Sequence, residues 1–299
     1  GYYMKSYPIH YHTLKNGERL AYSRTGTTGP ALILLHGNLS SSVHFYQLAE
    51  ALEGDFQLIL PDMRGFGHSS YQQPVHSLQE LALDLVELMD VLAIPSYAIL
   101  GWSTGGGVAL EMAALKPQAV EQVFLLASIG IQGYMSPSGI NRPQLGLLPL
   151  LIQTNRAMAK WNPVLQKVEL ALQNRDQRIL KKIMDPLYQL YPISEQDYQA
   201  YMDAMCQQQN YSDIFINLFT FNMTNQTNGL VAGTNRIQDV TCPVIIIHGD
   251  KDKVVRMDSA LLTYQTLKQQ AQLYVMDAGH SIQTDQPNQL ADILRKHLL

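Results

Sequence analysis

Cysteine is scarce in this sequence: Cys206 and Cys242 are the two in 299 residues, and no C-x-x-C spacing occurs. Two thiols placed in this way form neither a disulfide framework nor a thiolate metal centre, so we expect free thiols in a reducing compartment. No apolar run approaches the roughly 20 residues that a membrane-spanning helix needs. The first ten residues contain no hydrophobic segment like that of a secretory signal. We therefore expect a cytoplasmic protein that does not enter a membrane.

An excess of positive charge is also missing. The 21 lysines and arginines are outnumbered by 25 aspartates and glutamates, which gives a net charge of −4. Such a chain has no basic surface for nucleic acid or anionic lipid, so neither is expected as a partner. Hydrophobic residues make up 46% of the chain and charged residues 15%, a composition that supports a large core and excludes disorder. The expected partner is a small molecule, bound by a monomer or a homodimer.

The stretch 97–115, YAILGWSTGGGVALEMAAL, joins a short apolar run to a helix-forming segment through a glycine-rich turn. Residues 97–100 predict a buried parallel strand, and residues 106–115 predict a helix. A turn as tight as GWSTG at 101–105 places Ser103 in a strained backbone conformation at the corner. It also requires near-absent side chains two positions away on either side, which the glycines provide. G-x-S-x-G between a strand and a helix is a nucleophile elbow, so the sequence predicts Ser103 as a nucleophile.

Apolar runs alternate with helix-like segments along most of the chain. Further strands are expected at 31–35, 56–60, 120–127, 244–247 and 273–276, and an N-terminal hairpin is expected around Asn16-Gly17. Between the sixth and seventh strands only helix-like stretches occur, at 144–160, 163–184, 194–209 and 211–221. The pattern predicts an α/β fold with a mostly parallel central sheet flanked by helices. Its core would comprise residues 1–130 and 238–299, with a helical cap of residues 131–237 inserted after the sixth strand.

A serine hydroxyl needs a base within hydrogen-bond reach, and imidazole is the natural one near neutral pH. His280 lies in a glycine-rich turn after the last predicted strand, where the chain order serine, acid, histidine places the base. His248 is the alternative, but it precedes the carboxylates. The loop after the seventh strand offers Asp250 and Asp252 as the acid, and their spacing alone does not decide between them. Asp252 is preferred for its G-x-x-D position, so the predicted triad is Ser103, Asp252 and His280.

Attack by Ser103 on a carbonyl group would place negative charge on the carbonyl oxygen, which prearranged N–H donors stabilise. The predicted donors are the backbone N–H of Thr104, at the start of the helix, and that of Asn38, in the loop after the third strand. The charged residues of PDMRGFGHSS at 61–70 are interpreted as structural, with Asp62 and Arg64 fastening a glycine-rich loop. This chemistry requires no metal and no organic cofactor.

Five motifs carry a family resemblance: HGN at 36–38, DMRGFGHS at 62–69, GWSTGGG at 101–107, HGDKD at 248–252 and AGHS at 278–281. Through them the chain, from about residue 31 onward, resembles α/β-hydrolases of the capped serine esterase and lactonase type. The resemblance implies hydrolysis of carboxylic esters through an acyl-enzyme. Serine at 103 separates the chain from haloalkane dehalogenases and epoxide hydrolases, which place aspartate there. The methionine- and aromatic-rich cap favours small to medium, uncharged, partly apolar substrates.

Three alternatives stay open beside the esterase. A lactonase acting on acyl-homoserine or related lactones would use the same residues. A hydrolase of carbon–carbon bonds would take acidic substrates and would need cap arginines in its pocket; the candidates are Arg142, Arg156, Arg175, Arg178 and Arg236. A protein of a different class, a ligand-binding receptor with a retained hydrolase core, is the third.

Overall fold

The computed structural model of the protein describes residues 4–135 and 146–299. Within them, eight strands form one sheet in the order β1-β2-β4-β3-β5-β6-β7-β8. β2 is antiparallel to both of its neighbours, β1 and β4, and the remaining neighbours are parallel. The strands are β1 His10–Thr13, β2 Arg19–Thr25, β3 Ala31–Leu35, β4 Gln57–Pro61, β5 Tyr97–Trp102, β6 Val120–Leu126, β7 Val244–Gly249 and β8 Ala271–Met276. The predicted fold class is confirmed.

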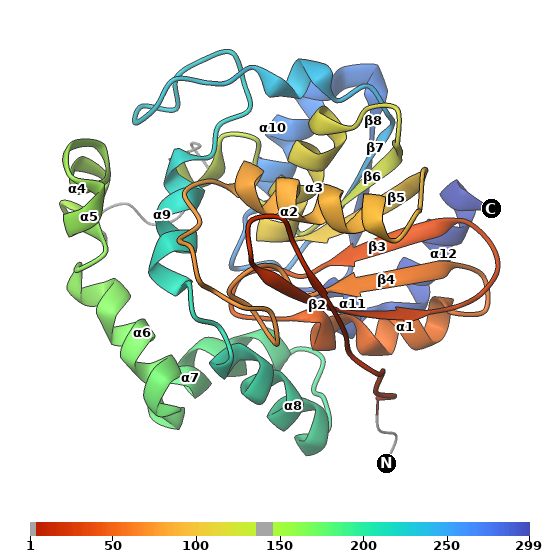
Figure 1. Cartoon of the computed structure of the whole chain (residues 1–299), viewed down its shortest axis with the longest axis horizontal. Helices are drawn as coiled ribbons and strands as arrows, with labels where there is room; N and C mark the ends of the chain where they lie inside the picture. Colours follow the sequence, from red (N-terminus) through yellow and green to blue (C-terminus); the bar gives the residue numbers. More distant parts are fainter. Residues whose placement is uncertain (1–3, 136–145) are drawn as a thin grey trace.

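Helices cover both faces of the sheet (Figure 1). One face packs against α2 Leu78–Val91, α3 Thr104–Leu115 and α10 Met257–Leu267, and the other against α1 Tyr46–Leu52, α11 Ile282–Asp285 and α12 Pro287–Leu298. Successive side chains of a strand point to opposite faces of the sheet. In β3, Ile33 packs on the face covered by α2, α3 and α10, and Leu34 packs on the face covered by α1, α11 and α12. Because both faces are buried, these strands are continuous apolar runs in the sequence.

The predicted N-terminal hairpin joins β1 to β2. The Leu14 N–H donates to the Glu18 carbonyl oxygen at 2.7 Å, and the Gly17 N–H donates back to the Leu14 carbonyl oxygen at 2.9 Å. Gly17 has a φ of +89°, a conformation that glycine adopts without steric cost. The short 3-10 helices in the described part of the chain are η1 Ser42–Phe45, η2 Gly133–Met135, η4 Asp185–Tyr188, η5 Arg236–Asp239 and η6 Lys268–Gln270.

Between β6 and β7 the described residues form helices and loops but no strand. The helices are α4 Leu148–Thr154, α5 Arg156–Ala159, α6 Pro163–Asn174, α7 Gln177–Met184, α8 Glu195–Cys206 and α9 Tyr211–Thr220. In Figure 1 they form an arm along the left and lower sides of the sheet. They bury apolar side chains among themselves and against Leu39 and Val43 of the core. We call this segment the insertion.

Two of the long helical stretches predicted in the insertion are each broken into two helices. The stretch 163–184 breaks at Arg175, which has a left-handed φ of 52°, and Asp176 then caps α7 by accepting a hydrogen bond from the Arg178 N–H at 3.1 Å. The stretch 144–160 breaks at Asn155, whose side chain caps α5. Local capping by Asp and Asn competes with helix continuation, and the apolar spacing does not report it. Residues 144, 145 and Arg142 lie outside the described residues.

Both cysteines are free thiols: Cys206 is half-buried and Cys242 buried. Burial raises the pKa of Cys242 to about 11. In the part of the chain that the structure describes, every helix is too short or too polar to traverse a bilayer.

Candidate active site

The turn between β5 and α3 holds Ser103 in a conformation that few residues adopt, with φ 54° and ψ −117°. The Ser103 N–H donates to the Leu126 carbonyl oxygen at 2.9 Å. A Cβ atom on Gly101 would lie 2.3 Å from the Gly105 carbonyl oxygen, and one on Gly105 would lie 2.5 Å from the His36 carbonyl oxygen. The two glycines of the G-x-S-x-G pattern therefore permit the close approach that puts the serine at the corner.

His280 and Asp252 meet in a buried contact. His280 Nδ1 lies 2.8 Å from Asp252 Oδ2, and the Asp252 side chain is fully buried. Asp252 Oδ1 accepts hydrogen bonds from the N–H groups of Val254 at 2.8 Å and Val255 at 2.9 Å. Burial alone would raise the pKa of Asp252, but His280, His248 and the Val255 N–H outweigh it and lower that pKa. An ionised Asp252 accepts a hydrogen bond from the Nδ1–H of His280, and the lone pair of His280 then lies on Nε2.

The two rival residues have other partners. Asp250 is exposed, and Oδ1 of its carboxylate lies 3.2 Å from Lys251 Nζ. His248 is buried, with Nε2 2.7 Å from the Val255 carbonyl oxygen and 3.4 Å from Asp252 Oδ2. Burial lowers the pKa of His248. The structure thus brings Asp252, not Asp250, to the imidazole of His280.

Trp102 joins the loop that carries Ser103 to the loop that carries His280. Its indole Nε1–H donates to the His280 carbonyl oxygen at 2.9 Å, and the two rings lie 5.6 Å apart between centroids. Sequence reasoning assigned no role to Trp102. Its place before Ser103, at the carboxyl end of a buried strand, is the signal that would have identified it.

Ser103 and His280 line the same cavity of about 140 Å³, which we call the inner cavity. Asn38 and Trp102 complete its wall on the side of the sheet. The insertion supplies apolar and aromatic side chains to the opposite wall, including Met184, Leu187, Tyr188 and Met205. The expectation that some insertion residues line a cavity over Ser103 could not name them, because helical spacing does not distinguish packing from lining residues.

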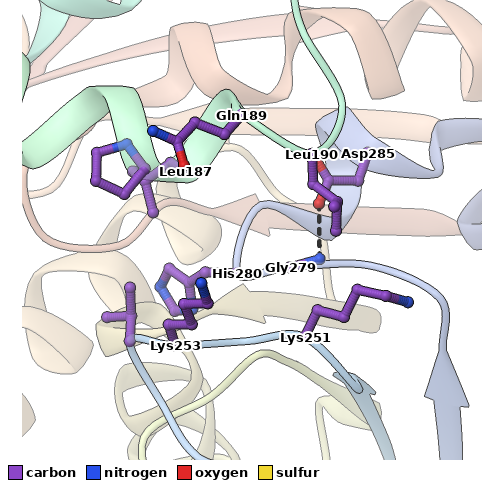
Figure 2. A pocket seen from close by; sticks show the side chains of 10 residues that line it. Leu187, Gln189, Leu190, Lys251, Lys253, Gly279, His280 and Asp285 are labelled. Atoms are coloured by element: carbon purple, nitrogen blue, oxygen red, sulfur yellow. Dashed lines mark hydrogen bonds between the residues drawn. The ribbon is translucent and has the colours of Figure 1, made fainter.

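A second cavity of about 290 Å³ lies on the other side of His280 (Figure 2), and we call it the outer cavity. It shares Leu187, Val254 and His280 with the inner cavity. The backbone N–H of Gly279 donates to Asp285 Oδ2 at 2.8 Å, the dashed bond in Figure 2. Burial raises the pKa of Asp285 to about 6. The three shared residues therefore line both cavities.

The two predicted N–H donors flank Ser103. Thr104 is the first residue of α3, where backbone N–H groups have no acceptor within the helix. Asn38 lies in the loop after β3, which approaches Ser103 closely, since a Cβ atom on Gly37 would lie 3.1 Å from the Ser103 Cβ. Asn38 lines the inner cavity. A side chain at position 37 would crowd Ser103 and the Trp102 carbonyl oxygen, which its Cβ atom would approach to 3.0 Å.

The 62–69 loop is held by buried polar contacts. Asp62 accepts hydrogen bonds from the Ser42 N–H at 2.9 Å and from the His68 N–H at 3.0 Å. Arg64 Nε lies 2.8 Å from Asp84 Oδ2, and both side chains are buried. The His68 side chain is exposed. These contacts agree with the structural role inferred for the segment.

His44 is a wall residue of the inner cavity that the sequence did not single out. Its ring stacks on Tyr201, with centroids 4.3 Å apart and an interplanar angle of 15°. Nδ1 accepts a hydrogen bond from the Ser41 N–H at 3.3 Å. Burial, together with His36, lowers the pKa of His44 to about 3. His44 is therefore neutral near pH 7 and adds no charge to the cavity.

The buried His44 makes stability depend on pH. Its native pKa of about 3 is below its unfolded value, so between the two the unfolded chain binds a proton that the native chain does not. Each pH unit of acidification in this window removes about 1.4 kcal/mol of stability. In His44→Phe, which keeps a ring against Tyr201, this loss is absent. We expect the free energy of unfolding in urea of the variant, relative to that of the wild type, to rise by about 1.4 kcal/mol for each pH unit of acidification between about pH 6 and 4.

The control for this prediction is His68→Gln, which changes an exposed histidine. Its stability should follow the wild type at every pH. If the free energies of unfolding of the wild type and of His44→Phe change in parallel with pH, the buried, neutral state of His44 is contradicted.

A family model of the alpha/beta hydrolase fold matches residues 30–287. The chain belongs to this family, and it is a hydrolase of the α/β fold. It is similar to Lipase 1 of Psychrobacter immobilis, with 25% identity over 284 residues that cover 94% of this chain and 80% of the lipase. Among solved structures it is similar to an esterase from Exiguobacterium antarcticum, with a TM-score of 0.74, 18% identity, and coverage of 96% and 98% of the two chains. It is also similar to Est816, described as an N-acyl homoserine lactone degrading enzyme, with a TM-score of 0.66, 20% identity, and coverage of 97% and 100%.

Proposed function

We propose that the protein is a serine esterase that cleaves carboxylic esters of small to medium, uncharged, partly apolar substrates. One observation carries the proposal: Ser103, at the strained turn, and His280, held by Asp252 at 2.8 Å, line one apolar cavity. Residues 131–237 would act as the cap of this site. Similarity to lipases and esterases at about 25% identity or less supports the reaction class and leaves the substrate open.

The proposed mechanism is acyl transfer. The Ser103 hydroxyl oxygen attacks the ester carbonyl carbon while His280 Nε2 accepts the hydroxyl proton. Asp252 stabilises the resulting imidazolium, and the N–H groups of Asn38 and Thr104 stabilise the oxyanion. His280 then protonates the departing alcohol as the tetrahedral intermediate collapses to the acyl-enzyme. Water, deprotonated by His280, releases the acid and restores Ser103.

The charge of the inner cavity favours an ester over an acidic carbon–carbon substrate. Of the arginines in residues 4–135 and 146–299, none lines the cavity. Four of the five candidate cap arginines lie in the described residues and are engaged elsewhere: Arg156 with Asn217 and His76, Arg175 with Asp203, Arg178 with Asp176, and Arg236 with Glu111. A carboxylate in the cavity would therefore lose its hydration without gaining a cation, which is costly.

Lactone hydrolysis is the second candidate, because the similarity to the homoserine lactone degrading Est816 covers nearly the whole chain. The test is a panel of p-nitrophenyl esters, γ-lactones and an acyl-homoserine lactone. A higher kcat/KM on open-chain esters supports the esterase, and a higher value on lactones supports the lactonase. A compound that raises the melting temperature but is never consumed, with every ester and lactone inert, would favour a binding protein.

The size of the inner cavity predicts the preferred acyl chain. A cavity of about 150 Å³ in another protein holds benzene, a six-carbon ligand, and the inner cavity is of similar size at about 140 Å³. We therefore expect kcat/KM in the p-nitrophenyl series to peak at acyl chains of about four to six carbons and to fall steeply by laurate. A flat profile, or an optimum at laurate, would refute the assignment of the acyl group to this cavity.

The variant Leu187→Ala also tests the assignment of the acyl group to the inner cavity, by enlarging the space available to it. Leu187 lines both the inner and the outer cavity, so we expect its truncation to connect them. The optimum should move to longer acyl chains, with laurate hydrolysis rising about tenfold relative to butyrate. The matched control is Leu190→Ala, because Leu190 lines the outer cavity alone. That variant should keep the profile of the wild type.

A further inference from the structure

The buried side chain of Gln208, in the insertion, forms hydrogen bonds with the loop after β3. Gln208 follows α8 and is 5% exposed. Its Oε1 accepts a hydrogen bond from the Leu39 N–H at 2.8 Å. Its Nε2 donates to Asn38 Oδ1 at 2.7 Å and to Asn210 Oδ1 at 2.9 Å. A residue 170 positions away in sequence thus contacts both residues that follow Gly37.

These three bonds fix the orientation of the Gln208 amide. An amide group has two N–H donors and one carbonyl acceptor, and here both donors and the acceptor have partners. Rotating the amide by half a turn would set its NH₂ group against the Leu39 N–H, two donors facing one another. The neighbouring amide of Asn210 is fixed as well, since its Nδ2 donates to the Arg64 carbonyl oxygen at 2.8 Å.

The bond to Leu39 also distinguishes the two N–H groups of the loop. Leu39 has a left-handed φ of 53°, an unfavourable conformation for a branched side chain. Its N–H is occupied by Gln208, so it is not available to a substrate oxygen. The N–H of Asn38 is the one that this arrangement leaves for the inner cavity. Gln208 therefore holds Asn38 on two sides, through the N–H of Leu39, which follows it, and through the side-chain oxygen of Asn38 itself.

The same segment is fastened to the second loop at this end of the sheet. The Gln209 N–H donates to the Gly65 carbonyl oxygen at 2.8 Å, next to the bond between Asn210 and Arg64. Arg64 is itself held by its buried ion pair with Asp84. Gln208 therefore belongs to a rigid, polar junction between the insertion and the core, and it is the member that contacts the 36–39 loop.

We propose that Gln208 is a positioning residue for ester hydrolysis. Through its amide the insertion holds the 36–39 loop so that the Asn38 N–H points to the developing oxyanion. The inference rests on the proposed esterase function and extends it, because it makes the insertion part of the apparatus that stabilises the transition state. Gln208 contacts neither the substrate nor Ser103 and acts through the loop.

The variant Gln208→Met tests the proposal, since methionine has a similar length and can form none of the three bonds. We expect kcat for p-nitrophenyl butyrate to fall about 10- to 100-fold, the effect of a misdirected stabilising group, while KM changes less than about threefold. The matched control is Gln209→Met, one residue along the chain, where the side chain is exposed. It should retain the kcat of the wild type.

Inhibitor binding separates positioning from a general loss of structure. A trifluoromethyl ketone forms a tetrahedral adduct whose oxygen carries the charge of the transition state, whereas the corresponding alkyl ether resembles only the bound substrate. For Gln208→Met, the Ki of the ketone should rise by the same factor by which kcat/KM falls. The Kd of the ether should stay within about twofold.

Gln208→Ser, which leaves space for water, serves as a second variant and should show the same pattern. The proposal is overturned if kcat stays within about twofold of the wild type, if ketone and ether binding weaken together, or if both variants fail to fold. Failure of the proposed function has a different signature: the wild type itself would be inert on every ester and lactone.

Discussion

Ser103→Ala is expected to lower kcat for p-nitrophenyl butyrate by about a millionfold, to the level of background hydrolysis. In the proposed mechanism the side chain supplies the oxygen that forms the acyl-enzyme, and alanine offers no atom in its place. The same backbone turn can be kept, because alanine is no larger than serine. The Kd of an unreactive ester analogue should therefore be the same in the variant and in the wild type. Steady-state hydrolysis is measured on untreated enzyme. A separate aliquot is titrated with a fluorophosphonate to give the concentration of reactive sites, and mass spectrometry of the labelled peptide identifies the labelled residue.

Ser128→Ala is the matched control for this experiment. Ser128 is a buried serine just beyond β6, and its hydroxyl donates to the Ile129 carbonyl oxygen at 2.9 Å. This variant should hydrolyse esters within about threefold of the wild type and should label at Ser103. Turnover by Ser103→Ala at more than a hundredth of the wild-type rate would remove Ser103 as the nucleophile.

Asp252→Asn is expected to lower kcat by about ten-thousandfold, and the surroundings of the carboxylate explain the size of the effect. Oδ1 accepts hydrogen bonds from the N–H groups of Val254 and Val255. In the variant these donors hold the amide oxygen, so the NH₂ group must face His280 Nδ1. Nδ1 then becomes the acceptor, and the proton moves to Nε2. An imidazole protonated at Nε2 cannot accept the proton of Ser103.

Asp250→Asn provides the comparison, because Asp250 lies two residues away and is exposed beside Lys251. We expect its kcat to remain within about twofold of the wild type. The pair is measured on the same ester under the same conditions. A large loss in Asp250→Asn with a small one in Asp252→Asn would reverse the assignment of the acid.

The sequence predicts the parts of this molecule that depend on local chemistry. The buried strands appear as apolar runs because both faces of the sheet are covered, and the elbow appears because Gly101 and Gly105 must lack side chains. Asp250 and Asp252 could only be ranked. Hydrogen bonds from the N–H groups of Val254 and Val255 orient the Asp252 carboxylate toward His280. The spacing of residues in the sequence does not predict these hydrogen bonds.

Long-range contacts account for what the sequence did not predict. Gln208 and Asn38 are 170 positions apart, and the Trp102 indole bonds to a carbonyl 178 positions away. His44 is buried in the wall of the inner cavity by contacts that include the ring of Tyr201, which α8 places over it. Nothing in the local pattern of Gln208 or His44 separates either residue from ordinary core packing. The break at Arg175 was missed for a local reason, since one residue with positive φ leaves the apolar period almost unchanged.

The backbone of Ser103 has an evolutionary consequence. A residue with a side chain held at φ 54° and ψ −117° costs the native state about 1–3 kcal/mol. Glycine would adopt this conformation freely, so the most stable descendant of this chain at position 103 is an inactive one. Selection for hydrolysis and selection for stability therefore oppose each other at a single position. A lineage that no longer needed turnover would be free to relax there first, and glycine at this corner would mark a protein that has given up catalysis and kept the fold.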